Sequence, residues 1–244
     1  MNSLSDRTCD ALNGDARFCE ELMALRRVAI YGGTFDPVHN GHVEVARRVL
    51  KLFELDEVIF VPACVPPHKR SANITSAFHR FAMLALATET DRRLLVSTVE
   101  LDSPEEPYAV ETVERFRGTL GDQTELFFLM GADSWLEITS WHEWQRLLRM
   151  CHFIVVTRPG FEIEGVDYSN MSIPVVNVPG DDWRWREMES EMKRPHVLLT
   201  DAANVDVSAT KIRAAARVND LDELKTMVPP AVATYIEKYD LYRN

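Results

Sequence analysis

The sequence contains no apolar run of the roughly 18 residues that a membrane-spanning helix needs, so we expect no transmembrane segment. Residues 1–27 carry charges throughout and lack the apolar core of about 7–15 residues that marks a secretory signal peptide. Cysteine is also scarce: Cys9, Cys19, Cys64 and Cys151 form no CxxC pair and have no metal-ligand spacing. These absences predict a cytoplasmic protein with free thiols, and a Cys9–Cys19 disulfide is the alternative that stays open.

Basic residues are the minority among the charged ones. The chain of 244 residues has 27 Lys and Arg against 38 Asp and Glu, which gives a net charge of −11. A negative overall field does not attract nucleic-acid polymers or an anionic bilayer, so we expect neither as a partner. Hydrophobic residues at 46% and charged residues at 27% are ordinary values for a globular protein that buries its own core.

Short apolar runs alternate with helical patterns from residue 28 onward. Strands are expected at 28–31, 58–63, 94–101, 126–133, 152–159, 174–178 and 197–201. Helices are expected at 43–53, 78–88, 108–118, 141–150, 208–217 and 229–242. Such alternation is typical of βαβ units. We therefore predict an α/β fold, a single doubly wound Rossmann-like domain over 27–244 with a mostly parallel sheet and helices on both faces. Residues 1–26 are an extension before the core or a disordered tail.

The first expected strand runs into the loop GGTFDPVHNGH, residues 32–42, which leads into a helix. Glycines let the backbone approach a ligand closely, and a helix N-terminus favours an anion. His39 and His42 lie at the start of that helix, where imidazoles can donate hydrogen bonds to phosphate oxygens. A phosphate site is one interpretation of this segment. A simple turn before a helix, or a metal site completed by Glu44, are the others.

Two further loops at expected strand ends suit an anion. Residues 207–213, VSATKIR, open a helix with Ser208 as its N-cap and with Thr210 and Arg213 in the first turns. Residues 65–70, VPPHKR, form a rigid turn that carries basic side chains. Each of these alone is explained by a well-capped helix or a solvated loop. Together with the first loop they predict a phosphate-binding edge, because the carboxyl ends of parallel strands meet at one edge of the sheet.

The two outer segments resemble motifs of the nucleotidyltransferase superfamily, GxFDPxHxGH for residues 32–42 and SSTxIR for residues 208–213. The segments between and after them are similar to bacterial nicotinate-mononucleotide adenylyltransferases: VPACVPPHK, HRFAML, GADSW, WHEW, TRPG and the terminal VPPAVATYIEKYDLY. The resemblance spans about residues 27–242 in the family's order.

The resemblance implies an enzyme of NAD biosynthesis that transfers AMP from ATP to nicotinate mononucleotide, releasing nicotinic acid adenine dinucleotide and pyrophosphate. It also implies assistance by Mg²⁺ with ATP, and direct in-line attack without a covalent enzyme intermediate. Homo-oligomerisation is left open. A nicotinamide mononucleotide or dual-specificity adenylyltransferase is the alternative of the same class. A nucleotide-binding regulator with a dead site is the alternative of another class, although it would be expected to have lost at least one of His39, His42, Lys69 and Arg213.

The resemblance also implies roles for individual residues. The catalytic residues are His39, His42 and Arg213. The residues that bind ATP and its phosphates are Gly33, Thr34, Phe35, Lys69, Ser208 and Thr210. The residues that bind the mononucleotide are Ala109, Asp133, Trp141, His142 and Arg158. No residue is assigned as a metal ligand.

Within the mononucleotide set, Trp141 matches the tryptophan that stacks on the pyridine ring, whereas Trp144 is expected in the core. The resemblance implies that the backbone near Ala109 and His142 holds the nicotinate carboxylate. It also implies that Asp133 contacts a ribose or the water shell of Mg²⁺.

This sequence departs from the family pattern at two positions. Ala209 replaces the second serine of SSTxIR, which removes a hydroxyl but keeps the backbone N–H, so a small effect is expected. Ala109 stands where the family often has threonine. If the contact there is through the backbone, alanine is tolerated, whereas a contact through the hydroxyl puts the preference for nicotinate in doubt.

Overall fold

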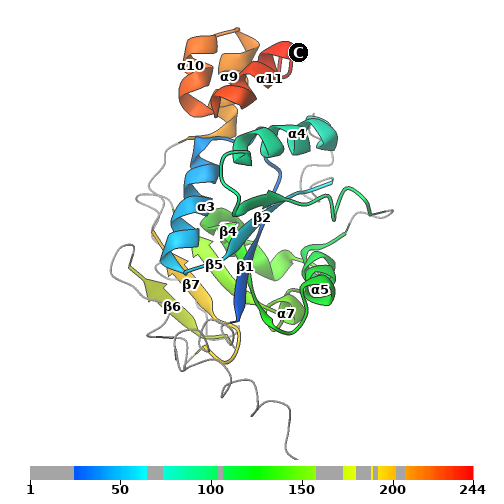
Figure 1. The fold of residues 1–244 in the computed structure, drawn as a ribbon, viewed down its shortest axis with the longest axis vertical. Helices are drawn as coiled ribbons and strands as arrows, with labels where there is room; N and C mark the ends of the chain where they lie inside the picture. The colour runs from blue at the N-terminus through cyan, green and yellow to red at the C-terminus, as the bar shows by residue number, and fades with distance from the viewer. Residues whose placement is uncertain are drawn as a thin grey trace, which may run out of the picture.

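A seven-stranded parallel sheet lies at the centre of the part of the chain that the computed structural model describes, with strand order β3-β2-β1-β4-β5-β7-β6 (Figure 1). The described residues are 25–64, 74–103, 107–157, 173–179, 188, 192–201 and 207–243. The strands are β1 (Arg26–Gly33), β2 (Glu57–Pro62), β3 (Leu94–Val96), β4 (Thr124–Gly131), β5 (His152–Val156), β6 (Val175–Val178) and β7 (Val197–Thr200).

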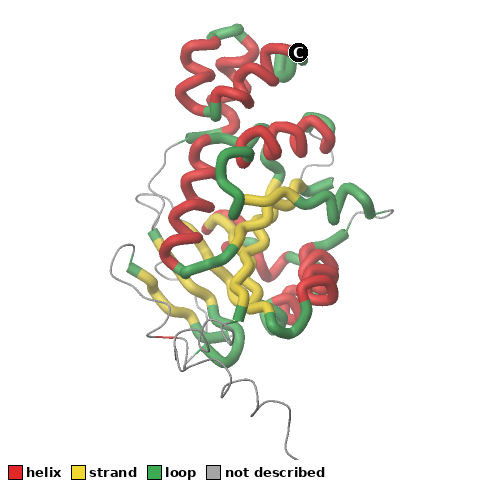
Figure 2. Tube along the Cα trace, viewed as in Figure 1, coloured by secondary structure: helices red, strands yellow, loops and turns green. Residues whose placement is uncertain are grey.

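Helices cover both faces of this sheet, as Figure 2 shows. They are α3 (Asn40–Leu52), α4 (Ala77–Thr88), α5 (Ala109–Leu120), α6 (Ala132–Leu136), the 3₁₀ helix η2 (Ile138–Ser140), α7 (Trp144–Leu147), α9 (Ala209–Arg217), α10 (Leu221–Met227) and α11 (Pro230–Lys238). Helices α3, α4, α9, α10 and α11 pack into one core cluster, and α5, α6 and α7 pack into the other. This arrangement confirms the predicted doubly wound α/β fold and makes the described sheet wholly parallel.

Burial on both faces explains why the central strands read as continuous apolar runs. Val28, Ala29 and Ile30 of β1 have no exposed surface, and they alternate between the two core clusters. Strand β1 pairs with β2 on one side and with β4 on the other. Strands β2 and β3 are added toward one edge of the sheet and the later strands toward the opposite edge, so the strand order reverses between β1 and β4. Ligands of such sheets bind outside the carboxyl ends of the strands at this switch point.

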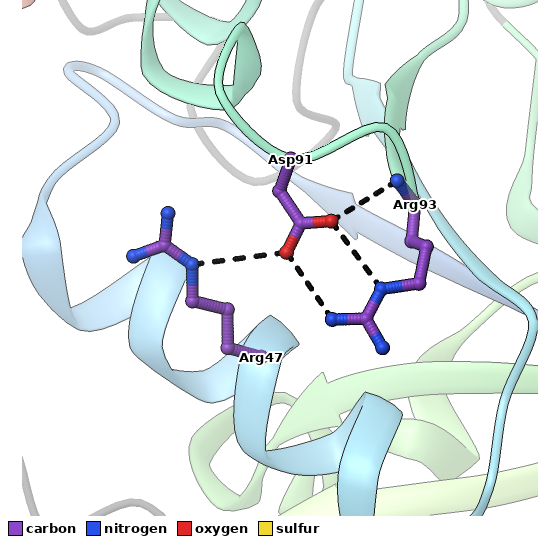
Figure 3. Close-up of polar contacts among 3 residues, drawn as sticks. All are labelled: Arg47, Asp91 and Arg93. Atoms are coloured by element: carbon purple, nitrogen blue, oxygen red, sulfur yellow. Dashed lines mark hydrogen bonds and ion pairs between the residues drawn. The ribbon is translucent and has the colours of Figure 1, made fainter.

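Ion pairs at the surface connect helix α3 with the turn between α4 and β3. Figure 3 shows Asp91, in the turn between α4 and β3, which accepts a hydrogen bond from the backbone N–H of Arg93 at 3.1 Å. The same carboxylate lies 4.0 Å from the Arg47 guanidinium of α3. Because the arginines are half-exposed, each pair contributes at most about 1 kcal/mol to stability.

Several sequence-based boundaries are corrected by the structure. The strand expected at 94–101 ends at Val96, because a turn closed by the Asp102 N–H and the Thr98 carbonyl follows it. The prediction of a helix at 141–150 was wrong, because only the short helix α7 forms there. Glu143 adopts a left-handed backbone conformation with φ of 48°, which excludes a continuous helix. The helix expected at 108–118 runs on to Leu120 and stops at Gly121, whose φ is +76°.

Two α-helices were not expected from the sequence. They are α6 directly after β4, and α10, which Asp220 caps by accepting a hydrogen bond from the Glu223 N–H at 3.0 Å. No helix within the described ranges is long and apolar enough to cross a membrane. Cys64 and Cys151 carry free thiols, whereas Cys9 and Cys19 lie outside the described residues. The division of the chain at residue 26 stays a prediction.

Candidate active site

Two cavities adjoin each other at the carboxyl end of β1. The first, about 480 Å³, is called the histidine cavity and is lined chiefly by His39, His42, Asp133, Ser208, Thr210 and Arg213. The second, about 280 Å³, is called the tryptophan cavity and is lined chiefly by Glu100, Tyr108, Ala109, Phe128, Trp141 and His142. Backbone from Gly32 to Thr34 lines both, so this short segment separates one cavity from the other.

Close packing requires glycine in that shared segment. A Cβ atom at Gly33 would lie 2.9 Å from the Phe35 ring, and one at Gly32 would lie 3.3 Å from the Phe128 ring. Phe35 is buried and has a left-handed φ of 49°, which turns the loop back over β1. Its ring packs edge-on against His42 with centroids 5.0 Å apart. The loop is therefore held by its own aromatic side chain while its backbone faces the two cavities.

The geometry of the two histidines fixes which nitrogen of His42 can donate. His39 is the N-cap of α3, and its backbone N–H donates to Nδ1 of His42 at 3.2 Å. The two rings stack with centroids 3.6 Å apart. Because Nδ1 of His42 accepts this bond, the proton of the neutral ring lies on Nε2. His42 therefore has an Nε2–H donor at the start of a helix, where the dipole favours negative charge.

The carboxylate that would complete the alternative metal site at this position is engaged in an ion pair. The carboxylate of Glu44 accepts from the Arg48 Nε at 2.6 Å. Within the described ranges, no group of three or more His, Cys, Asp or Glu side chains is placed to hold a metal ion.

Helix α9 brings the second phosphate-suited segment to the histidine cavity. Ser208 caps this helix as predicted, since its Oγ accepts from the Lys211 N–H at 3.3 Å. Arg213 donates through Nη1 to the Asp36 carbonyl at 2.8 Å and through Nη2 to the Thr210 hydroxyl at 3.3 Å. Segments separated by 177 residues in the chain thus lie against each other, and the guanidinium is held at the edge of the cavity.

Aromatic side chains shape the tryptophan cavity. Trp141 packs edge-on against Phe128 with centroids 6.1 Å apart. The rings of Tyr108 and His142 stack with centroids 4.3 Å apart, which joins the start of α5 to the segment that carries Trp141. Trp144 packs against the core cluster of α5 and α7, as the sequence predicted. Aromatic walls of this kind are typical of sites that bind flat apolar rings.

The structure brings together all the described residues that the sequence had proposed for the site. Asp133 lines the histidine cavity rather than the tryptophan cavity. Gly131 and Ser134 line both cavities and were not anticipated. Lys69 and Arg158 lie outside the described residues, so their placement stays a prediction.

Sequence reasoning missed Arg80 and Glu100. The side chain of Arg80 is 1% exposed and donates to the carbonyls of Thr34 and Ala63, each at 2.7 Å. Both carbonyl residues line the tryptophan cavity. The HRFAML segment contributed to the resemblance, but only the folded contacts show what its arginine holds.

Glu100 carries a carboxyl group that is poised to titrate near neutral pH. It lines the tryptophan cavity and accepts from the Thr112 hydroxyl at 2.9 Å. Burial raises the pKa of Glu100 to about 7, against the opposing effects of the Thr112 hydrogen bond and of the charges on Arg115 and Arg80.

The raised pKa of Glu100 predicts a stability that falls with pH. The folded state holds this proton more tightly than the unfolded chain, whose pKa is the ordinary 4.5. The stability that the group contributes is therefore complete below pH 4.5 and is lost as the pH rises through 7. From pH 5 to 8, this change lowers the free energy of unfolding by about 2–3 kcal/mol.

We expect Glu100→Gln to remove this pH-dependent part of the free energy of unfolding, because glutamine has the same shape and stays neutral. Urea unfolding at pH 5 and at pH 8 measures it, with the exposed Glu114→Gln as the control. The stability of Glu100→Gln relative to the native chain should rise by that amount between the two pH values. A relative stability that is equal at both pH values would contradict the raised pKa.

Comparison with known proteins places the chain among nucleotidyltransferases. The sequence model of the cytidylyltransferase-like family matches residues 30–215. A probable nicotinate-nucleotide adenylyltransferase of Thermoanaerobacter is 38% identical over 89% of this chain and 95% of its own length. The corresponding protein of Moorella thermoacetica is also 38% identical, over 89% of this chain and 92% of its own. Among solved structures, the Plasmodium falciparum nicotinic acid mononucleotide adenylyltransferase complexed with NaAD shares the fold, with a TM-score of 0.64 at 20% identity over 89% of this chain and 97% of that one.

Proposed function

The chain belongs to the nicotinate-nucleotide adenylyltransferase family within the cytidylyltransferase-like proteins, and from this we propose that its two cavities hold the two substrates of adenylyl transfer. The enzyme transfers the adenylyl group of ATP to nicotinate mononucleotide, in NAD biosynthesis, and releases pyrophosphate. One observation carries the division of the site: Gly32 to Thr34 lines both cavities. Two nucleotides that meet over this segment have their phosphates side by side.

The reaction asks the protein for position and charge rather than for a covalent step. A phosphate oxygen of nicotinate mononucleotide attacks the α-phosphorus of ATP. The new P–O bond forms as the bond to the bridging oxygen of pyrophosphate breaks, and no proton has to move. Alignment of the two reactants and stabilisation of the developing charge then supply the catalysis.

The histidine cavity suits the triphosphate. In our proposal the Nε2–H of His42 donates to an oxygen of the α-phosphate, where negative charge builds up in the transition state. His39 stacks on it and contributes the helix N-terminus. Arg213, with Ser208 and Thr210, binds the leaving pyrophosphate. Lys69, from the loop after β2, is proposed to add a further charge.

The tryptophan cavity suits the pyridine base. Trp141 is proposed to stack on the ring, with Arg158 as a further contact to the mononucleotide. Ala109 is the first residue of α5, and the first backbone N–H groups of a helix have no acceptor within the helix. Such N–H groups at Ala109, together with that of His142, favour the anionic carboxylate over a neutral carboxamide. On this account alanine at position 109 keeps the contact.

Magnesium is proposed to enter the site with ATP. The carboxylate of Asp133 lines the same cavity as the phosphate-suited residues and suits a contact to the water shell. Bound there, the ion would neutralise charge on the phosphates. A cytoplasmic location, where ATP is at hand, is part of the same proposal.

Parallel kinetics with the two mononucleotides test the assignment of the base. We expect kcat/KM for pyrophosphate release to be at least about tenfold higher with nicotinate than with nicotinamide mononucleotide, which corresponds to about 1.4 kcal/mol. Equal values would overturn the carboxylate contact and favour the dual-specificity alternative. ATP binding without turnover on either substrate would favour the nucleotide-binding regulator.

A further inference from the structure

The end of the chain returns to the loop that carries the histidine motif. The hydroxyl of Tyr242 donates to Oδ1 of Asp36 at 2.8 Å, across 206 residues of sequence. Tyr242 lies beyond α11 and packs against the core cluster of α3, α4 and the C-terminal helices. Asp36 lines the histidine cavity. A residue next to the C-terminus therefore reaches the edge of the proposed ATP site.

Asp36 is held from three directions. Its Oδ1 accepts from Tyr242, and its Oδ2 accepts from the Thr75 N–H at 3.4 Å, just before α4. Its backbone carbonyl accepts from Nη1 of Arg213 at 2.8 Å. The position of this one residue thus depends on the C-terminus and on the start of α4, and the direction of Arg213 depends on it in turn.

The tyrosine hydroxyl is suited to a permanent contact. Burial, helped by the negative charge of Asp36, raises the pKa of Tyr242 above its ordinary value, so the hydroxyl keeps its proton and stays a donor at neutral pH. The donor of this contact is therefore present at neutral pH.

We propose that Tyr242 is a positioning residue for ATP: by holding the Asp36 side chain, it fixes the carbonyl that orients Arg213 toward the triphosphate. The inference rests on the proposed function only in that the histidine cavity takes ATP. Tyr242 lines neither cavity, so its effect reaches the ligand through Asp36 and Arg213.

Substitution by phenylalanine isolates the hydroxyl, because the ring and its packing remain. We expect Tyr242→Phe to weaken the Kd for Mg-ATP about five- to tenfold, which lies within the range of the net contribution of one ordinary hydrogen bond. The Kd for nicotinate mononucleotide should change less than about twofold on the same scale. Calorimetric titration of each ligand into the full chain measures both.

A second tyrosine provides the matched control. Tyr239 is 47% exposed and packs at a tilt of 45° against the Tyr235 ring, with centroids 4.5 Å apart, and it lines neither cavity. Tyr239→Phe should bind Mg-ATP like the native chain. In addition, Tyr242→Phe should change the Kd for Mg-ATP much less in an Asp36→Ala background, because the carboxylate that accepts from the Tyr242 hydroxyl is already gone. Additive effects of the two changes would overturn the proposed route through Asp36.

The outcomes separate the positioning role from a structural one. An unchanged Kd for Mg-ATP in Tyr242→Phe overturns the proposal, and so does an equal weakening of both ligands. Failure of the proposed function would show in a different measurement: the native chain would release no pyrophosphate from ATP in the presence of nicotinate mononucleotide. The titration with ATP does not depend on that result.

Discussion

Replacement of His42 by alanine is expected to lower kcat about 10²–10³-fold, with a much smaller change in KM for either substrate. The reason is the fixed tautomer. Because Nδ1 of His42 accepts the His39 N–H at 3.2 Å, the Nε2–H is oriented as a donor before ATP binds. A donor of this kind stabilises charge that appears mainly in the transition state, so its loss appears in kcat.

A second variant separates chemistry from folding. Asparagine at position 42 can keep an acceptor for the His39 N–H, but it is too short to place a donor where Nε2 lies. His42→Asn should therefore unfold like the native chain and yet be about as slow as His42→Ala. His79→Ala is the control, since His79 on α4 contacts the Tyr235 hydroxyl at 2.9 Å and lines neither cavity. Native-like turnover in either position-42 variant would contradict the role given to His42.

Replacement of Arg80 by methionine is expected to lower the free energy of unfolding by more than about 3 kcal/mol. The guanidinium donates to four backbone carbonyls, those of Thr34, Ala63, Cys64 and Thr75, at 2.7, 2.7, 3.0 and 2.9 Å. Thr34 lies in the connection between β1 and α3, and the other three residues lie in the connection between β2 and α4. Methionine fills similar volume but leaves buried acceptors without this donor.

Urea unfolding at pH 7 measures the effect of Arg80→Met, with Arg48→Met as the control. Arg48 is half-exposed and pairs with Glu44 within α3, so its loss should cost less than about 1 kcal/mol. Lysine at position 80 keeps the charge but not the fork of donors, and we expect an intermediate loss. Equal unfolding free energies for Arg80→Met and the native chain would show that the four carbonyl contacts do not stabilise the loops.

The parts of the fold that local pattern determines were predicted from the sequence. Strands β1 and β4 are buried on both faces, so their residues form apolar runs that periodicity detects. The N-cap at Ser208 depends on its own and the next three residues, and it was found. The helix expected at 141–150 failed for a conformational reason, because the apolar spacing there is helical but Glu143 turns left-handed.

The contacts that long-range packing determines could not be predicted in this way. Tyr242 and Asp36 are 206 residues apart, and neither residue type nor spacing links them. Arg80 lies on a helix whose pattern gives no sign that one arginine is fully buried. The raised pKa of Glu100 depends on burial in a cavity that exists only after folding. The sequence located the motif loops, and the folded chain adds the residues that hold them.

The most direct test of direct adenylyl transfer measures pyrophosphate and dinucleotide together. The enzyme is mixed with Mg-ATP alone and with Mg-ATP plus nicotinate mononucleotide, and both products are quantified from the first turnover onward. We expect no pyrophosphate from ATP alone, and equal amounts of pyrophosphate and nicotinic acid adenine dinucleotide when both substrates are present. Release of one equivalent of pyrophosphate from ATP alone, or turnover without formation of the dinucleotide, would contradict direct adenylyl transfer.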